Sequence, residues 1–150
     1  MSLTIRPISP SDIPSLLGLY RHLIPEDPPL ARDDAAEILK RISAYAGSAI
    51  YGGFENGALV TSCALFVVPN LTRGGRSFAL IENVVTHAAH RNRGHGKAIL
   101  KAVVNAALEH DCYKVMLLTG SKRPETIIFY LGAGFEQTKT GFEIRILPRR

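Results

Sequence analysis

A strand, a glycine-containing turn and an amphipathic helix follow one another between residues 78 and 109, and this unit limits the choice of fold most. The run from Phe78 to Thr86 is apolar and suited to a strand, and Gly94 and Gly96 follow it closely. Apolar residues then recur at helical spacing, namely Ile99, Leu100, Val103, Val104, Ala107 and Leu108. A helix with one apolar stripe must bury it against another layer, so we predict a sheet covered by helices.

Two further strand-like runs precede this unit, and a strong hairpin signal joins them. Ala49 to Phe54 and Ala58 to Val68 flank Glu55-Asn56-Gly57. Asn-Gly favours a tight turn because both residues tolerate positive φ. The two runs are therefore predicted to be neighbouring antiparallel strands.

The rest of the chain alternates short helices and strands. We expect strands at 3–7 and 114–118 and a final pair between 134 and 147, with helices at 11–24, 32–46 and 126–132. No internal repeat or linker interrupts this order. The sequence thus predicts one α/β (α+β) domain over residues 1–150, with a mixed, mostly antiparallel sheet flanked by about four helices.

The positive charge of the chain indicates an anionic ligand of limited size. The formal net charge is +5, yet the cations are interleaved with glycine and apolar residues, and only Arg149-Arg150 resembles a basic tail. Aromatic residues are not interleaved with the basic ones, which argues against a nucleic-acid surface. No apolar run approaches the roughly 18 residues of a membrane span. We therefore expect a cytoplasmic protein with a local anion pocket.

The turn that opens the long helix is the predicted place of that pocket. Backbone amides at a helix start bind phosphate, and Arg91, Arg93 and Lys97 would add positive charge. A dinucleotide fingerprint would need a third glycine, and a P-loop would need Ser or Thr in place of Ala98. The spacing therefore favours a pyrophosphate site that is neither a dinucleotide fingerprint nor a P-loop. Glycines in such a turn can also be there for packing alone.

Two motifs resemble those of the GNAT superfamily of N-acetyltransferases. Ile81-Glu82-Asn83-Val84-Val85-Thr86-His87, followed by Arg91-x-x-Gly94-x-Gly96, is similar to the family's coenzyme-binding motif. Phe129-Tyr130-Leu131-Gly132-Ala133-Gly134-Phe135 resembles the family's tyrosine helix and the Gly-Phe start of the next strand. The resemblance implies a GNAT-like fold over nearly the whole chain and acetyl-coenzyme A as the cosubstrate.

The resemblance also implies which residues bind the coenzyme. Backbone groups of Val84, Val85 and Thr86 would hold the pantetheine arm like an added strand. The pyrophosphate would lie on the segment Arg91, Asn92, Arg93, Gly94, His95, Gly96 and Lys97. Arg123 falls near a polar coenzyme contact where the family often has Asn, so a solvated loop cation is an equal alternative.

The chemistry of acetyl transfer needs a base and an acid. An aliphatic amine is protonated below a pKa of about 10.4, so its proton must be removed before attack. Glu82 is the first candidate, through water or by binding the ammonium; a structural carboxylate paired with an arginine is the alternative. Tyr130 matches the family's general acid by position, with a core aromatic as the alternative. The Val85 amide is the expected oxyanion donor.

The cysteines and histidines are expected to be structural. Cys63 and Cys112 lack the spacing of a zinc or redox site, and no covalent acyl-enzyme is needed. His87 and His95 are interpreted as turn residues, and no metal is expected. By family analogy, the candidates for acceptor specificity are His22, Glu26, Asp27, Arg73 and Arg76.

The leading hypothesis is direct acetyl transfer to a primary amine of a small metabolite, within a ternary complex. The resemblance extends to phosphosugar-amine acetyltransferases, which carry a Glu-Asp-Val-Val-like segment, but here Asn83 stands where the second acid would be. The alternatives are acetylation of a protein or peptide amine and a noncatalytic acyl-coenzyme A sensor. Homodimers are common in the family, and no sequence feature fixes an interface.

Overall fold

The computed structural model describes residues 2–147, which form a five-stranded sheet and four α-helices. The strands are β1 (Thr4–Pro7), β2 (Ala49–Glu55), β3 (Ala58–Val68), β4 (Phe78–Thr86) and β5 (Val115–Met116), in that spatial order. The first three pairings are antiparallel and β4 pairs with β5 in parallel. The predicted mixed, mostly antiparallel sheet is confirmed. The basic pair Arg149-Arg150 lies outside the described residues.

The β2–β3 hairpin forms at the predicted turn. Asn56 and Gly57 both have positive φ, at 51° and 79°. Glu55 pairs with Ala58, so the turn contains only these two residues. This geometry suits the right-handed twist of the two strands and fixes their register.

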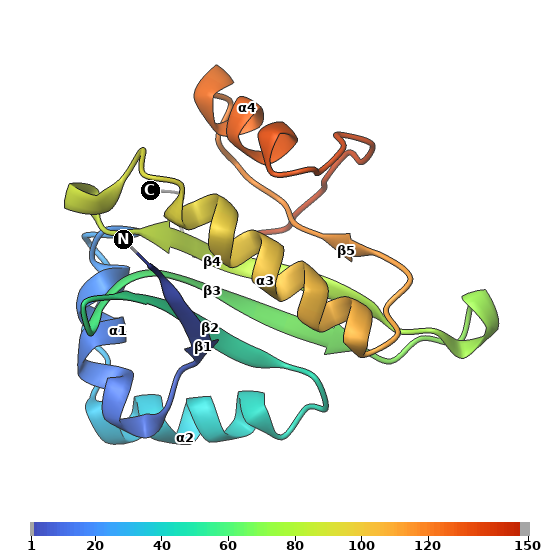
Figure 1. Ribbon diagram of the computed structural model, residues 1–150. Helices are drawn as coiled ribbons and strands as arrows, with labels where there is room; N and C mark the ends of the chain where they lie inside the picture. The colour runs from blue at the N-terminus through green and yellow to red at the C-terminus, as the bar shows by residue number, and fades with distance from the viewer. Residues whose placement is uncertain (1, 148–150) are drawn as a thin grey trace. The chain divides into compact units, whose positions relative to one another are not determined.

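The helices are α1 (Ile13–Tyr20), α2 (Arg32–Ser43), α3 (His95–Glu109) and α4 (Pro124–Gly132), with short 3-10 turns η1 (Pro10–Asp12), η2 (Arg73–Gly75) and η3 (Ala88–His90). Three of them, α1, α2 and α3, cover the two faces of the sheet (Figure 1). Figure 1 shows α3 on one face and α1 with α2 on the other. Leu16, Leu39 and Ile50 belong to the core under α1 and α2. On α3, Ile99, Leu100 and Val103 are fully buried, as the predicted stripe requires.

The chain divides into two compact units, residues 1–117 and 118–150. The first contains the whole sheet with α1, α2 and α3, and the second contains α4. The interpretation of residues 1–150 as one domain stays a prediction.

The final strand pair predicted between residues 134 and 147 is wrong: no strand follows β5 in the described part of the chain. The prediction placed the start of the pair at Gly134-Phe135 from local sequence alone, but a strand also needs a neighbour to complete its backbone hydrogen bonds. Here Phe142, Ile144 and Ile146 are 93%, 98% and 94% exposed. The strand expected at 114–118 is likewise reduced to two residues, and the first helix ends four residues early, at Tyr20.

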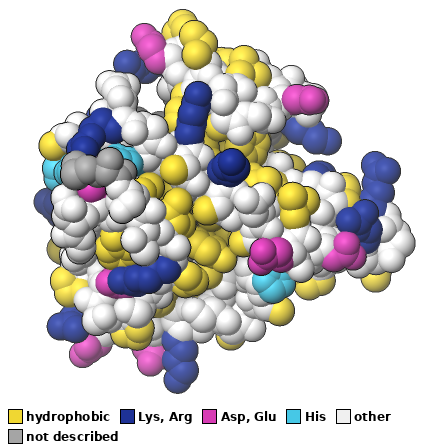
Figure 2. All heavy atoms as spheres, in the orientation of Figure 1, with side chains coloured by type: hydrophobic (Ala, Val, Ile, Leu, Met, Phe, Trp, Pro, Cys, Tyr) yellow, Lys and Arg dark blue, Asp and Glu magenta, His cyan; other side chains and the backbone are white. Residues whose placement is uncertain are grey.

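Two surface properties bear on the function. Figure 2 shows Lys and Arg side chains dispersed among acidic and apolar ones on the visible face, without one continuous basic stripe. Within residues 2–147, no helix has both the length and the apolar character needed to cross a bilayer.

Candidate functional site

A bulge in β4 is the first feature of the site. Ser62 pairs with Val85 and Ala64 pairs with Glu82, so Asn83 and Val84 together oppose the single residue Cys63. Asn83 has a φ of 53°. Asparagine adopts this left-handed conformation more readily than most residues, so the sequence suits a bulge here.

The bulge coincides with the separation of β4 from β5. These strands pair only at Ala79 with Val115 and at Leu80 with Met116. After Leu80, β4 pairs only with β3 within the described part of the chain. The stretch from Glu82 to Thr86 therefore offers a free strand edge, to which an extended ligand can add as a strand does.

Hydrogen bonds show which backbone groups face this free edge. The Val85 carbonyl accepts from the Thr61 hydroxyl at 2.9 Å, and the His87 amide donates to the Val60 carbonyl at 2.8 Å, so both residues face β3. Backbone groups alternate along the regular part of a strand, which turns those of Thr86 outward, and the bulge interrupts this alternation at Asn83 and Val84. The Val85 backbone therefore faces β3, which speaks against Val85 as the donor at the free edge, and the bulged Val84 is the remaining candidate.

The start of α3 is an uncapped helix N-terminus close in sequence to this edge. Gly94 is the N-cap residue, with a φ of 84° and no side-chain cap. The first helical hydrogen bond runs from the Ala98 amide to the Gly94 carbonyl at 3.0 Å. The amides of His95, Gly96 and Lys97 precede that bond, and together with the helix dipole they suit an anion.

The three predicted cations of this segment have different surroundings. Arg91 donates from Nε to the Thr86 carbonyl at 3.2 Å and from Nη2 to the His22 carbonyl at 3.3 Å. Arg93 pairs with Glu55 at 2.8 Å. Lys97 is exposed and makes no ion pair within residues 2–147. Arg91 thus ties the loop to its neighbours, whereas Lys97 is available to an incoming phosphate.

Asn92 has a structural part in the same loop. Its φ is 61°, and that of Gly94 is 84°, so the backbone turns twice through the left-handed region before α3 begins. Short turns of this kind bring successive amides to one side, where they can surround an anion.

Glu82 is exposed on β4, where it pairs with Ala64 immediately before the bulge. No salt bridge or hydrogen bond of its side chain is present among the described residues. Among these residues the structure therefore does not pair Glu82 with an arginine, and its carboxylate is accessible to a substrate.

Tyr130 and Arg123 belong to the second unit. Tyr130 packs against Phe129 and Phe135, with ring centroids 4.9 and 6.3 Å away. Arg123 precedes α4 and pairs with Glu125 at 3.5 Å, where both side chains are exposed. The catalytic role of Tyr130 and the coenzyme contact of Arg123 remain predictions.

The cysteines have the properties of core residues. Cys63 and Cys112 are free and buried. Burial raises the pKa of the Cys63 thiol to about 12, and burial also raises the pKa of Cys112. Thiolates are the nucleophilic form, so neither residue is suited to forming an acyl-enzyme near neutral pH.

The histidines divide into two groups. His87 Nδ1 accepts from the Ala89 amide at 3.1 Å, so it stabilises η3 as a turn residue. Partial burial and the neighbouring His22, His90 and Arg91 lower the pKa of His87. His95 differs from the expectation, because its imidazole is buried beside Glu55 and His90. Sequence spacing could not reveal this cluster, since Glu55 lies 35 residues before His90.

The residues assigned by analogy to the acceptor do not gather in one place. His22 lies beside His87, with ring centroids 4.0 Å apart, at the end of β4. Arg76 pairs with Asp111 at 3.0 Å, and Arg73 lies over the Tyr113 ring, both just before β4 begins. The ends of β4 are about 26 Å apart at the rise of a strand, so these residues cannot line one small pocket.

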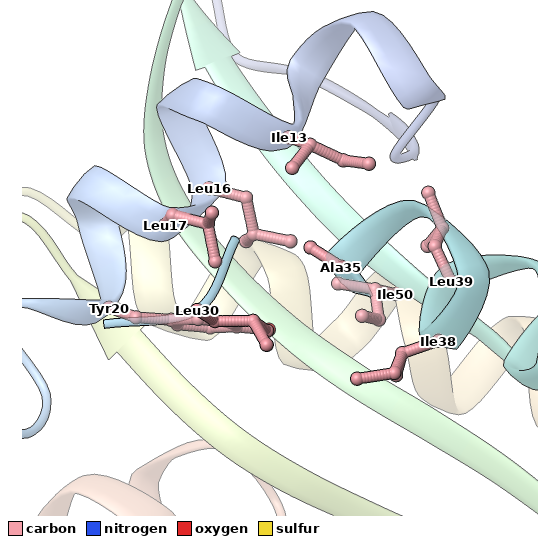
Figure 3. A pocket seen from close by; sticks show the side chains of 9 residues that line it. All are labelled: Ile13, Leu16, Leu17, Tyr20, Leu30, Ala35, Ile38, Leu39 and Ile50. Carbon is pink, nitrogen blue, oxygen red and sulfur yellow. The ribbon is translucent and has the colours of Figure 1, made fainter. Parts of the chain in front are cut away.

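A small apolar pocket lies between α1 and α2 (Figure 3). Its lining consists of Ile13, Leu16, Leu17, Tyr20, Leu30, Ala35, Ile38, Leu39 and Ile50. Burial raises the pKa of Tyr20 to about 12, so its hydroxyl stays neutral. With no charged lining residue, this pocket does not suit a phosphate, and the anion site is the start of α3.

Comparison with known proteins agrees with this arrangement. Residues 16–135 match the model of the Acetyltransferase (GNAT) family. The glucosamine 6-phosphate N-acetyltransferase of Trypanosoma brucei brucei is 34% identical over 90% of each chain. Glucosamine 6-phosphate N-acetyltransferase 1 of Oryza sativa subsp. japonica is 30% identical over 87% of this chain and 79% of its own.

A solved structure from Agrobacterium tumefaciens str. C58, described provisionally as an acetyltransferase, is 44% identical with a TM-score of 0.89. The similarity covers 95% of this chain and 99% of that one. A free β4 edge, an uncapped α3 and a family match across most of the length lead to one conclusion: the chain belongs to the GNAT family and is an N-acetyltransferase.

Proposed function

We propose that this enzyme transfers the acetyl group of acetyl-coenzyme A directly to the primary amine of a small metabolite, within a ternary complex. The observation that carries the proposal is the free edge of β4 after the bulge at Asn83 and Val84. The uncapped start of α3 follows it in the chain. Together they provide a strand edge for an extended arm and amides for a diphosphate.

The residues present fit the coenzyme. The outward Thr86 amide suits a hydrogen bond to a carbonyl of the pantetheine arm, and the amides of His95, Gly96 and Lys97 suit the pyrophosphate. The exposed Lys97 ammonium adds charge at that position. When bound, acetyl-coenzyme A supplies the acetyl group as an activated thioester.

Glu82 and Tyr130 are proposed to move the protons. The carboxylate of Glu82 accepts the proton of the acceptor ammonium, directly or through one water, which frees the nitrogen lone pair for attack. The Val84 amide stabilises the negative oxygen that develops at the acetyl carbon. The Tyr130 hydroxyl donates a proton to the departing thiolate, and the resulting phenolate takes up the second proton that the attacking nitrogen loses. An amide and a thiol are formed, and the first proton passes from Glu82 to solvent.

A phosphorylated amino sugar is the proposed acceptor class. Two relatives that match most of this chain are named glucosamine 6-phosphate N-acetyltransferases. Asn83 stands where the phosphosugar-amine enzymes carry a second acid, but it occupies the left-handed position of the bulge, where asparagine serves the backbone. The bulge thus gives a backbone reason for Asn83, and the two relatives are what support the sugar phosphate as acceptor.

The test is binding followed by turnover. Calorimetric titration with acetyl-coenzyme A should give saturable binding, and thiol release should then depend on the added amine, with glucosamine 6-phosphate among the best acceptors. Glucosamine without its phosphate is the matched control and should be poorer. Binding with peptide-dependent release alone would favour a protein acetyltransferase, and binding without turnover on any amine would favour a sensor. Absence of binding would contradict the proposal.

A further inference from the structure

Glu55, His90 and His95 form a compact group beneath the loop before α3, and this group has no part in the proposed transfer chemistry. They come from the end of β2, from η3 and from the first residue of α3. Each offers one ligand atom, and the three atoms lie within 4.8 Å of one another. His90 Nδ1 is 3.0 Å from Glu55 Oε2, and His95 Nε2 is 3.7 Å from Glu55 Oε1.

One atom of the group is unsatisfied. The His95 side chain is 8% exposed, and its Nε2 is buried without a hydrogen-bond partner in the part of the chain that the structure describes. The separation of 3.7 Å from Glu55 is beyond hydrogen-bond range. A buried polar atom left without a partner destabilises the folded chain, so the site is suited to a ligand that an imidazole nitrogen can bind.

The spacing of the ligand atoms fits a tetrahedral metal ion. With metal–ligand bonds of about 2.1 Å, ligand atoms stand about 3.4 Å apart. His90 Nδ1 lies 3.0 Å from Glu55 Oε2, and His95 Nε2 lies 3.7 Å from the other carboxylate oxygen, Oε1, so each nitrogen is near this value from one oxygen of Glu55. The widest separation, at most 4.8 Å, would have to close by somewhat more than an ångström. The His90 side chain is 28% exposed, so it has more freedom to move toward an ion than the buried Glu55 and His95.

A cation already occupies part of this position. Arg93 Nη2 is 2.8 Å from Glu55 Oε1, and Nη1 is 3.0 Å from His90 Nδ1. The guanidinium does not satisfy His95 Nε2, and the Arg93 side chain is 39% exposed, so it can swing out to solvent. The buried carboxylate of Glu55 thus attracts positive charge that either the guanidinium or a metal ion can provide.

We propose that Glu55, His90 and His95 bind a divalent transition-metal ion of the zinc class in place of the Arg93 guanidinium. Two imidazoles and one carboxylate suit zinc, whereas magnesium and calcium prefer oxygen ligands alone. Three protein ligands leave one coordination position open. The released Arg93 and the anchored His95 both belong to the segment proposed to bind pyrophosphate, so the metal would sit directly beneath that loop.

The experiment is a titration of the chelator-treated protein with Co²⁺, followed by visible absorption, and then displacement by Zn²⁺. We expect one equivalent of Co²⁺ with the absorption bands of a tetrahedral ion, and loss of these bands when Zn²⁺ is added. Glu55→Gln and His95→Ala should each weaken binding at least tenfold. Arg93→Ala should strengthen binding, because the competing cation is gone. His110→Ala, an exposed histidine outside the group, should bind as the parent does.

Three results would overturn the proposal. One is the absence of saturable metal binding in both the parent protein and Arg93→Ala. This comparison does not require Glu55→Gln to fold. Another is unchanged affinity in His95→Ala. The third is loss of binding in His22→Gln, because His22 and His87 lie 4.0 Å apart and would then be the true ligands. None of these readouts depends on the coenzyme or on acetyl transfer.

Discussion

Two glutamates near the functional loop have opposite surroundings, and these decide what each can do. Glu55 is 4% exposed and is held by Arg93 and His90. Glu82 is exposed and has no ion pair among residues 2–147. A buried carboxylate needs a positively charged partner, so it serves to stabilise the fold or to bind a cation. A free carboxylate on the open strand can exchange protons with a substrate.

Replacement of Glu82 by Gln should therefore slow acetyl transfer. We expect kcat/KM to fall about 100-fold at neutral pH, the usual contribution of a general base, with unchanged coenzyme affinity. The loss should shrink as the pH rises toward the pKa of the amine, because the acceptor then loses its proton without help. Steady-state rates from pH 6 to 10 check this, with Glu37→Gln, an exposed carboxylate of α2, as the control. A uniform loss at every pH would assign Glu82 to substrate binding instead.

Tyr130→Phe should separate acid catalysis from packing. The phenylalanine ring keeps the contacts with Phe129 and Phe135, so folding and coenzyme affinity should be retained. Turnover should fall at least tenfold, since the thiolate leaves without a proton donor. Rapid-mixing measurements of thiol release test this, and Tyr45→Phe, an exposed tyrosine, is the control. Unchanged turnover would remove Tyr130 from the acid role.

At the scale of elements, α3 connects the core to the anion site. Ile99, Leu100, Val103 and Ala107 are fully buried and fix the helix against the sheet. Its N-terminus stays uncapped, with Gly94 in the left-handed conformation. The buried face of α3 thus fixes the position of its N-terminus and of the free amides there.

Two substitutions of Gly94 should distinguish charge from backbone strain. Gly94→Glu places a negative side chain beside the amides of α3 and should weaken coenzyme binding at least 100-fold. Gly94→Asn keeps a residue that tolerates a φ of 84°, and a Cβ at this position meets open space, so its affinity should fall no more than about tenfold. Calorimetry of both variants gives the comparison. Equal affinity for Gly94→Glu and the parent would refute the phosphate site.

At the scale of the whole molecule, the proposed chemistry draws on both compact units. The β4 edge and the start of α3 belong to residues 1–117, and Tyr130 belongs to residues 118–150. The family match over residues 16–135 crosses the boundary between them. Stability of the first unit also depends on its beginning, where Arg6 and Asp12 link β1 to the turn before α1.

The Arg6–Asp12 pair predicts an acid-dependent stability. Asp12 accepts from Arg6 at 2.7 Å and from the Ser9 amide at 2.8 Å. The side-chain hydrogen bond from Arg6, with smaller help from Ser9, holds the pKa of Asp12 well below its usual value. Because the folded pKa is depressed, this stabilisation is present above the unfolded pKa, about 4, and is lost as the pH falls below it.

Asp12→Asn keeps the acceptor for the Ser9 amide but removes the charge that pairs with Arg6, so it should lower the free energy of unfolding by at most about 1 kcal/mol at pH 7, the usual range for a largely exposed ion pair, and by less as the pH falls. Chemical denaturation at pH 7 and at about pH 3.5 checks the difference. Glu37→Gln, which removes an exposed carboxylate of α2, should have a small effect at both values. A loss for Asp12→Asn that is equal at both pH values would contradict the linkage.

The sequence by itself determined the elements whose signals are local. The Asn56-Gly57 turn, the bounds of β3 and β4, the apolar stripe of α3 and the glycine turn before it depend on propensity and periodicity within a few residues. The family resemblance followed from the same stretches. Local signals failed where a strand depended on a distant partner: the strand pair predicted between residues 134 and 147 is absent from the described chain, where Phe142, Ile144 and Ile146 are exposed.

The tertiary structure alone decided three features of the site. Which backbone groups of Val84 and Val85 point toward β3 depends on how β4 pairs with β3. The sequence of β4 does not specify that pairing. The roles of Arg91 and Arg93 depend on carbonyls and a carboxylate from other elements. The group of Glu55, His90 and His95 joins residues up to 40 positions apart. Sheet pairing and packing bring such partners together, so only the folded chain reveals them.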